Sequence, residues 1–579
     1  MADNKSQAHD KKVLHSMGYA QELSRRMSGF SNFAISFSII CILAGGISAF
    51  PAAFNSLGSG GAVMIWLVGG FLAMTVAWGM GQIASSFPTA GGLYHWSSHL
   101  GGKFLGWATA WLNLVGLVCV VSSVDVLLYT VFFKGLFMQT AIGGNLWMNN
   151  WTLSVTNSIT IDLWQMVFLI IVMSSQALLN HFGIELTTKL TDFSGYFILV
   201  VTVILIIVLF AFSPVALDFS RLWTFQNVTG DAGGGVVPFH TGNFGFAFLL
   251  GLSYVCYTIT GFYASAHTSE ETQNAQVNVP KGMWTAVFWS WVFGLVAVAA
   301  YVLTMPDLKA AQAAGWNSFF YMWGASLMPH WLSIVLTGCL VVSNYLCALA
   351  GMTSCSRMMY SFSRDGGIPF ISGTLSRVST QYRTPTYAIW FSAGLALLST
   401  LYAPAYLVLA VACAVFLYLS YVMPVLAGLI AEGTEKWKEK GPYNLGALSK
   451  PNAVISIIVG ILLAISGFFP PNEKVFYFTL IFAVALLTFW SKKYSLYGLG
   501  LAVLGLLATK IPIPETSNLH FLIPPMGTAI SALVVGVIGA AISYMRGGED
   551  ARFEGIPEGQ RIVDRQKMIA DIEKKFGEN

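Results

Sequence analysis

The stretch CILAGGISAFP (residues 41–51) lies inside an apolar run long enough to cross a membrane. Two adjacent glycines, a serine and a proline make this stretch a poor continuous helix. In hydrocarbon, a backbone N–H or C=O group without a partner costs several kcal/mol, so an interrupted helix persists only where protein covers it or where it lines a cavity. We therefore predict an interrupted membrane helix at this position, with a functional site beside it.

A second apolar run carries its own interruption at Thr258-Ile259-Thr260-Gly261. Paired interrupted helices in the two halves of a chain indicate the substrate site of a transporter. Glycines in membrane helices also serve simply to let helices pack closely, and this alternative stays open for either interruption alone.

The composition identifies the class of protein. Of the 579 residues, 55% are hydrophobic and 10% are charged, and the mean hydropathy is +0.67, whereas a soluble domain has about 25% charged residues. The seven cysteines fall in apolar runs without the spacing of a metal site, and the net charge of +4 gives no reason to expect nucleic acid as a partner. The chain is predicted to be an all-α polytopic protein embedded in a lipid bilayer.

Apolar runs of membrane-crossing length divide the chain into repeats. The first five are 29–56, 62–84, 105–133, 163–180 and 190–212, and the next five are 242–268, 282–304, 332–361, 386–403 and 405–430. An odd number of spans per unit inverts the second unit relative to the first. Four further runs, 452–469, 475–490, 494–509 and 527–545, bring the expected number of membrane helices from twelve to fourteen.

The predicted organisation has five parts. They are an amino-terminal tail (1–28), a first five-helix repeat (29–212), a second inverted repeat (242–430), accessory membrane helices (452–545) and a carboxy-terminal tail (546–579). With the amino terminus inside, 25 of the 30 Lys and Arg residues fall in tails and connections on the inner side. This asymmetry predicts a multi-pass cell-membrane protein with both termini in the cytoplasm.

The sequence lacks the motifs of several enzyme classes. It contains no Gly-rich nucleotide-binding loop, no nucleophile elbow and no metal-binding helix motif. We therefore expect no catalytic residue, no metal site and no cofactor. Transport energy would come from a gradient of H⁺ or Na⁺, or from exchange of solutes.

The two interruptions supply the candidate substrate groups. If the first helix stops near Ala44 and resumes near Ile47, its new amino-terminal end presents unpaired amides to a carboxylate. The carbonyl groups of Thr258 and Ile259 suit an ammonium group, so the pair would bind a zwitterion. The candidate binding residues are Ala44, Gly45, Gly46, Ile47, Ser48, Thr258, Ile259, Thr260, Gly261, Phe262 and Tyr263.

Polar side chains inside the spans give further candidates, because an ionisable group in hydrocarbon usually faces a cavity or a partner. Asp125 is expected to contact the substrate or a coupling proton, or else to serve packing alone. His267, Glu270 and Glu271, where the sixth span ends, are expected to act in gating. Adjacent hydroxyl groups on Thr353 and Ser354 offer a Na⁺ site, or bond only to the preceding helical turn.

Several ordered motifs resemble one family. They are MGYAQEL (17–23), FSNFAISFSII (30–40), GGIS (45–48), FPTAGGLYHWSS (87–98), TGFYASAHTSEETQNA (260–275) and SRMMYSFSRDGGIPF (356–370). Together with Asp125, they resemble the amino acid/choline transporter family of the amino acid, polyamine and organocation superfamily. The resemblance implies a five-plus-five inverted-repeat transporter fold, with substrate between the first and sixth helices, and a substrate such as an amino acid, 4-aminobutyrate (GABA), a polyamine or choline.

One position departs from the family pattern. The sixth helix usually reads Gly-Tyr-Asp-Ala-Ser-Ala-His, whereas here Tyr263 stands in place of the acid. We expect a secondary active transporter that moves a small amino acid or related amine by alternating access, driven by an ion gradient. The alternatives are an exchanger without net ion coupling and, less in keeping with the short tails and the single central carboxylate, a nutrient sensor or a channel.

Overall fold

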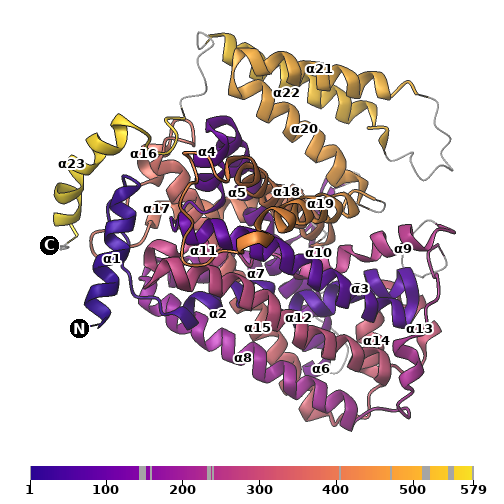
Figure 1. Cartoon of the computed structure of the whole chain (residues 1–579). Coiled ribbons are helices and arrows are strands. Elements are labelled where there is room, and N and C mark those ends of the chain that lie inside the picture. The colour runs from indigo at the N-terminus through magenta and orange to yellow at the C-terminus, as the bar shows by residue number, and fades with distance from the viewer. Residues whose placement is uncertain are drawn as a thin grey trace.

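Helices dominate the computed structural model of the chain (Figure 1). The residues that the structure describes are 2–142, 151–156, 159–230, 236–237, 240–402, 406–469, 472–511, 522–545 and 553–576. Within these ranges, the strands are the short antiparallel pair β1 (Thr152–Thr156) and β2 (Ile159–Asp162). The fold is therefore an all-α bundle with one small hairpin in a connection.

The first half of the chain supplies the first set of membrane helices. They and their short neighbours are α2 (Gly29–Ile40), α3 (Ala44–Ser86), α4 (Leu93–Gly101), α5 (Lys103–Leu127), the π-helix η1 (Leu128–Met138), α6 (Gln139–Ile142), α7 (Leu163–His181) and α8 (Ile184–Ala211).

The next part of the chain supplies the second set. Its elements are α9 (Phe244–Gly251), α10 (Ser253–Thr258), α11 (Ala264–His267), the 3₁₀ turn η4 (Ser269–Glu271), α12 (Ala275–Thr304), α13 (Leu308–Ala313), the 3₁₀ turn η5 (Gly315–Asn317), α14 (Ser318–Ala325), α15 (His330–Arg364), α16 (Ser372–Leu375), α17 (Thr386–Tyr402) and α18 (Tyr406–Ala431). The two sets interlock, because α12 packs along α3 and α2 while α18 packs along α5.

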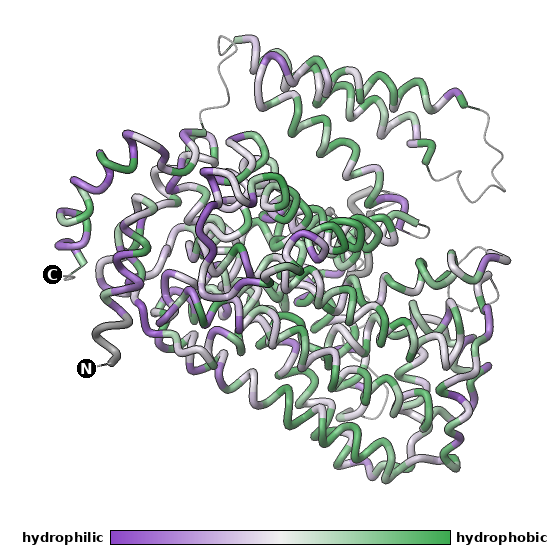
Figure 2. The backbone as a smooth tube through the Cα atoms, viewed as in Figure 1, coloured by the Kyte–Doolittle hydropathy of each residue, from purple (hydrophilic) through white to green (hydrophobic). Residues whose placement is uncertain are grey.

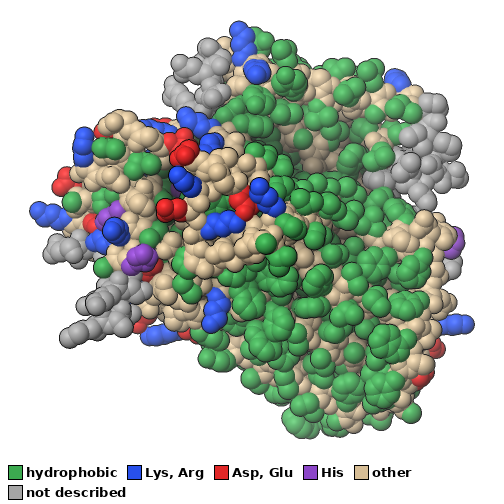
Figure 3. All heavy atoms as spheres, viewed as in Figure 1, with side chains coloured by type: hydrophobic (Ala, Val, Ile, Leu, Met, Phe, Trp, Pro, Cys, Tyr) green, Lys and Arg blue, Asp and Glu red, His purple; other side chains and the backbone are tan. Residues whose placement is uncertain are grey.

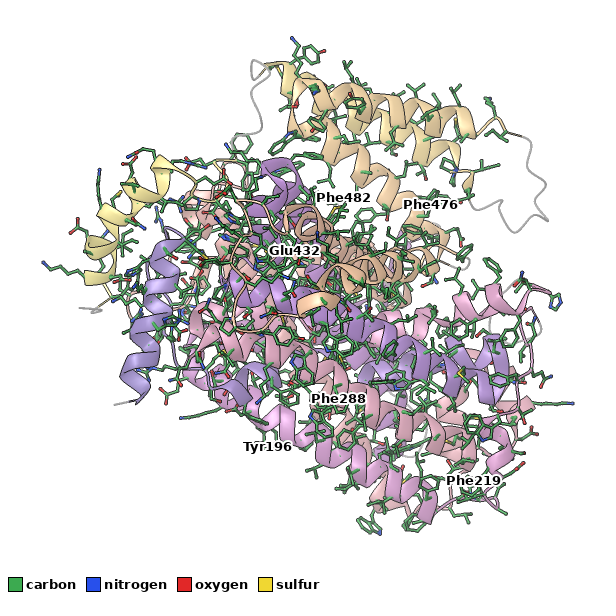
Figure 4. All side chains as sticks on the ribbon, viewed as in Figure 1. Tyr196, Phe219, Phe288, Glu432, Phe476 and Phe482 are labelled. Atoms are coloured by element: carbon green, nitrogen blue, oxygen red, sulfur yellow. The ribbon has the colours of Figure 1, made fainter. Side chains whose placement is uncertain are left out.

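Four accessory helices follow, namely α19 (Ser449–Ser466), α20 (Glu473–Trp490), α21 (Lys492–Ala508) and α22 (Met526–Met545). The last three pack mainly on one another and form a separate layer at the top of Figure 1. Phe482 of α20, labelled in Figure 4, anchors this layer by an edge contact with Phe416 of α18. Each predicted span thus falls on helical segments, including the weaker runs near the carboxyl end, and the first and sixth spans are divided between separate helices.

The predicted amino-terminal and carboxy-terminal tails each contain a helix. These helices are α1 (Ala2–Ser16) and α23 (Gln560–Lys574), which lie side by side at the left of Figure 1. Residues 546–552 of the predicted carboxy-terminal tail lie outside the described residues. We call the end of the bundle that carries these two helices the terminal side, and the opposite end the far side.

A sharp turn inside α3 joins the first two spans. Leu57 and Gly58 leave helical geometry, and Gly58 has a φ of 73°, which favours glycine. The amide of Met27, just before α2, donates to the carbonyl of Glu271, and Ser85, at the end of α3, donates to the carbonyl of Gln276. Both ends of this segment therefore lie on the terminal side, and the chain reverses at Leu57 and Gly58.

An apolar belt surrounds the bundle. Among the described residues, ten helices are long and apolar enough to cross a membrane, and three shorter apolar helices accompany them. Hydrophobic residues occupy the middle of the molecule, while hydrophilic ones gather at its two ends (Figure 2). In the space-filling view, charged side chains cluster around the termini, and a broad hydrophobic face begins next to them (Figure 3). This distribution is the one expected of a multi-pass membrane protein.

Candidate functional site

The first interruption lies slightly earlier than the sequence predicts. Helix α2 ends at Ile40, Cys41 adopts left-handed geometry with a φ of 35°, and the helix resumes at Ala44. The amide of Gly45 already donates to the carbonyl of Cys41 over 2.9 Å. The expectation that the helix stops near Ala44 and resumes near Ile47 is therefore wrong, because the glycine pair lies in the first turn of the resumed helix and not in the gap.

The second interruption lies where the sequence predicts it. Helix α10 ends at Thr258, and helical structure returns at Ala264. Gly261 has a φ of 78° between them, a backbone conformation that other residues rarely adopt. The break spans about five residues, so its carbonyl and amide groups need partners other than those of a helix.

Glycines bring the two interrupted helices together. A Cβ atom added to Gly45 would lie 3.3 Å from a methyl carbon of Thr258, and one added to Gly261 would lie 2.2 Å from a methyl carbon of Ile39. Each interruption therefore packs on the helix that carries the other one. Larger side chains at either glycine would push the two helices apart.

Two tyrosines of α18 form hydrogen bonds with the backbone of the second interruption. The hydroxyl of Tyr418 donates to the carbonyl of Ile259 over 2.8 Å, and the amide of Gly261 donates to the hydroxyl of Tyr421 over 3.1 Å. On the other side, the hydroxyl of Ser36 from α2 donates to the carbonyl of Phe262 over 2.6 Å. These bonds satisfy buried backbone groups that a continuous helix would have paired internally.

A small cavity of about 20 Å³ lies between the two interruptions. Its walls come from α2, α3, α5, α15, α18 and the residues around the end of α10, and its lining residues are Ile39, Ile40, Ala44, Gly45, Val120, Ser123, Val124, Tyr257, Thr260, Cys347 and Cys413. None of these residues carries a formal charge. A space of this size holds about one water molecule, so the site is closed around a volume smaller than an amino acid.

The structure separates the predicted binding residues into two groups. Ala44, Gly45 and Thr260 line the cavity. Ser48 instead bonds back to the carbonyl of Ala44, and the ring of Tyr263 packs against Tyr421 at 5.0 Å between centroids. The polar residue at position 263 therefore belongs to a layer of aromatic side chains behind the interruption.

Asp125 lies beside this cavity without lining it. The residue is fully buried on α5, and the side-chain amide of Gln176 on α7 donates to its Oδ1 atom over 2.8 Å. Its Oδ2 atom has no hydrogen-bond partner among the described residues. Asp125 thus faces the gap between α5 and α7, while its neighbours Ser123 and Val124 face the cavity.

The two candidate sodium ligands have different environments. The hydroxyl of Thr353 donates to Asn180 of α7 over 2.8 Å and is also within reach of the carbonyl of Leu349. Ser354 is fully buried, and its hydroxyl oxygen has no partner within the part of the chain that the structure describes. Ser354 is therefore the more available of the two oxygens.

The predicted gating acids pair with two arginines of α15. Glu271 receives two hydrogen bonds from Arg357, at 3.1 and 3.2 Å, and Glu270 receives two from Arg364, at 2.9 and 3.0 Å. Both acids are fully buried, and so is Arg357. We call Glu270, Glu271, Arg357 and Arg364 the acid–arginine cluster; it joins the end of the second interrupted helix to α15.

His267 and a neighbouring loop complete this region. The Nδ1 atom of His267 lies 3.0 Å from the carbonyl oxygen of Ala90, and the amide of Ala90 donates to Glu270 over 3.1 Å. Ala90 belongs to the turn between α3 and α4. The acid–arginine cluster therefore also holds the chain segment that follows the second span.

The segment that follows α1 and the helix α23 both contact Asp365, next to the acid–arginine cluster. The hydroxyls of Tyr19 and Tyr94 both donate to Asp365, over 2.8 and 2.6 Å, and Arg565 of the carboxy-terminal segment pairs with the same carboxylate over 3.3 Å. Burial and the nearby Asp365 carboxylate raise the pKa of Tyr19 well above its ordinary value. Tyr19 thus remains a neutral hydrogen-bond donor.

Glu573 fixes α23 against α1. Its carboxylate contacts Lys11 at 2.8 Å and His15 at 2.7 Å, and it accepts the amide of Gln21 over 2.9 Å. Although burial opposes ionisation, these three donors outweigh it, and the pKa of Glu573 lies below its ordinary value. These contacts are not evident from the sequence, because both tails are polar segments without a motif that would pair them.

Comparison with known proteins points to one family. Residues 27–490 match the model of the family described as amino acid permease. The chain is 32% identical to "Amino-acid permease BAT1 homolog" of Oryza sativa subsp. japonica over 75% of this chain and 82% of that protein. It is 31% identical to "Amino-acid permease BAT1" of Arabidopsis thaliana, over 75% and 83% of the two chains.

A fungal amino acid permease is also similar to this chain. The chain is 26% identical to "Amino-acid permease 2" of Neurospora crassa over 83% of this chain and 86% of that protein. The family model covers both interruptions, the acid–arginine cluster and the first two accessory helices. The chain therefore belongs to the amino acid permease family and is a multi-pass membrane transporter of amino acids, not an enzyme.

Proposed function

We propose that this permease carries a small neutral amino acid by alternating access, with both termini in the cytoplasm. The observation that carries the proposal is the closed cavity at which the two interrupted helices meet. Its lining has no formal charge, and an unpaired charge buried there would be costly. A zwitterion suits the site best, because its carboxylate and ammonium groups find partners at the helix ends on either side.

The absence of formal charge among the lining residues of the cavity favours neutral substrates over polyamines and choline. A permanent cation would need an acidic partner, and Tyr263 stands where the pattern of the family that the sequence resembles has an acid. The carboxylate of Asp125 does not line the cavity and is bonded to Gln176. The substrate carboxylate would approach the first turn of α3 at Ala44 and Gly45, and its ammonium group would approach Thr260.

Closure on the terminal side would follow from the acid–arginine cluster. In the present conformation, both acids are paired and buried, and Arg565 of α23 pairs with Asp365 next to them. Opening this side requires the segment Ser269–Glu271 to separate from α15. We propose that substrate release to the cytoplasm breaks these pairs, and that substrate binding restores them.

Two groups could couple transport to an ion. Asp125 is a buried carboxyl group with one unpaired oxygen and could carry a proton, and Ser354 could contribute an oxygen ligand to Na⁺. Asp125 is the stronger candidate, because it lies next to residues that line the cavity. An exchanger that needs neither ion is the alternative.

The test is uptake by the purified permease in liposomes. We expect accumulation of alanine-sized neutral amino acids, with weak competition by spermidine, choline or arginine. Imposing a pH gradient, a Na⁺ gradient or an internal amino acid load separates the three energy sources. Competition by spermidine or choline as strong as that by a neutral amino acid would contradict the proposed substrate class.

A matched pair of glycine variants locates the site. Gly45→Leu fills the contact with Thr258 and should abolish binding of the amino acid, whereas Gly394→Leu on α17, where a new Cβ meets open space, should leave binding intact. Both proteins must first show the same yield and the same elution volume as the wild type. Unchanged affinity in the Gly45 variant would place the substrate elsewhere.

A further inference from the structure

A groove of about 570 Å³ opens on the hydrophobic face of the bundle. It lies between α2, α8 and α12, and its walls include Phe30, Phe33, Lys281, Thr285, Trp289 and Phe293. Figure 4 labels residues on both flanks, Tyr196 on α8 and Phe288 on α12. The ring of Tyr196 stacks on Phe30 with 4.4 Å between centroids and so joins the α8 flank to α2.

The α12 wall of the groove is a single stripe that changes character along its length. Lys281, Thr285, Trp289 and Phe293 follow at intervals of four residues, so they lie on one face of the helix. At 1.5 Å per residue, the stripe runs about 18 Å from a cation to an aromatic ring. One leaflet of a bilayer has a hydrocarbon depth of about 15 Å, so the stripe has the length and the polarity of one lipid molecule.

Lys281 is the charged end of this stripe. It is exposed, and no acidic partner contacts it among the described residues. On the facing helix, Glu185 is already paired with Arg26 and Lys189. The ammonium group of Lys281 is therefore available to an anion at the terminal side of the hydrophobic face.

We propose that this groove binds an anionic phospholipid from the leaflet on the terminal side. Its phosphate would lie on Lys281, and one acyl chain would lie along Thr285, Trp289 and Phe293. The opposite wall is α2, the half-helix that ends at the first interruption, so the bound lipid would fasten α2 to α12 in the closed conformation. This inference does not depend on which amino acid is transported.

The experiment measures thermal unfolding of the purified full chain in detergent. Phosphatidylglycerol should raise the midpoint, because a ligand that binds only the folded protein stabilises it by mass action. Phosphatidylcholine with the same acyl chains should raise it less, and inorganic phosphate should not raise it. Lys281→Gln should weaken the phosphatidylglycerol affinity by about fivefold, since one basic residue near an anionic headgroup contributes about that factor.

Matched variants separate the groove from general charge effects. Lys438→Gln removes an exposed lysine on the terminal side and should keep the wild-type response, and Lys281→Arg should restore it. Thr285→Trp fills the groove without changing charge and should also reduce the response. Equal stabilisation by the two lipids, a wild-type response in Lys281→Gln or Thr285→Trp, an equal loss in Lys438→Gln, or full stabilisation by phosphate alone would each overturn the proposal.

Discussion

The two interrupted helices meet at a neutral cavity, whereas the terminal side closes around buried ion pairs. The cavity has uncharged walls, and tyrosine hydroxyls hold its backbone. The acid–arginine cluster instead joins its helices through paired charges. A neutral hydrogen bond contributes about 1 kcal/mol and is easily exchanged, while a buried ion pair that loses one partner leaves an uncompensated charge. Recognition and closure therefore rest on different interactions, and variants should separate them.

The largest effect is expected from Arg357→Met in the acid–arginine cluster. This change leaves the Glu271 carboxylate buried without its partner and should lower the free energy of unfolding by about 3–5 kcal/mol. Thermal unfolding of the purified protein measures the change. The control is Lys189→Met, which removes an exposed partner of Glu185 and should leave the midpoint unchanged. Similar unfolding midpoints for both variants would show that the buried ion pair contributes no more to stability than the exposed pair.

The next largest effect is expected at the second interruption, beside the neutral cavity. Tyr421→Phe removes the hydroxyl that accepts the Gly261 amide and should cost about 2 kcal/mol, because a buried N–H group is left without a partner. It should also weaken substrate binding more than it weakens the fold. Tyr196→Phe, on the exposed face of α8, is the control. Substrate binding that is unaffected in both variants would show that the tyrosine contact does not shape the site.

A variant of Asp125 tests whether transport is coupled to a proton beside the neutral cavity. If Asp125 carries the transported proton, Asp125→Asn should slow proton-driven uptake by about tenfold, equivalent to about 1.4 kcal/mol in the barrier. Exchange between amino acids on the two sides of the membrane should persist, because the cavity lining is intact. Liposome uptake with and without a pH gradient distinguishes the two activities. An equal loss of uptake and exchange would assign Asp125 to packing or to substrate contact.

The smallest effect is expected where α23 docks on α1. The pKa of Glu573 is lower in the folded protein than in the unfolded chain, so its ionised form stabilises docking above the unfolded value of about 4.3. This contribution is lost as the pH falls through the lower, folded value. Thermal unfolding between about pH 6 and pH 3 should show a steeper decline for the wild type than for Glu573→Gln, because this range includes the unfolded value and extends below it. Glu558→Gln, at an exposed position, should follow the wild type.

The spans were predictable, whereas the position of the first break was not. Hydropathy alone locates the helices because each must cross the apolar belt. The glycine pair at 45 and 46 suggests the wrong position for the break. Gly45 instead allows close packing on Thr258, and the residue with left-handed backbone geometry is Cys41. The position of the break depends on contacts between helices, and these contacts cannot be read from the sequence of one helix alone.

The partners of the gating acids could have been found in the sequence. Arg357 and Arg364 are seven residues apart, which is two helical turns, so they share one face of α15. Two adjacent acids at the end of one span and two basic residues on one face of another are a recognisable match. The pairing of tails was harder to foresee, because it depends on where α1 and α23 are placed by the rest of the bundle.

The reversal inside α3 has a practical consequence for engineering. Because Leu57 and Gly58 alone leave helical geometry between the first two spans, this hairpin has almost no loop to accept added sequence. A Cβ atom on Gly60 would already come within 2.8 Å of the backbone of Thr224. An epitope tag or protease site inserted there would therefore displace the Thr224 backbone from Gly60 and separate the first two spans.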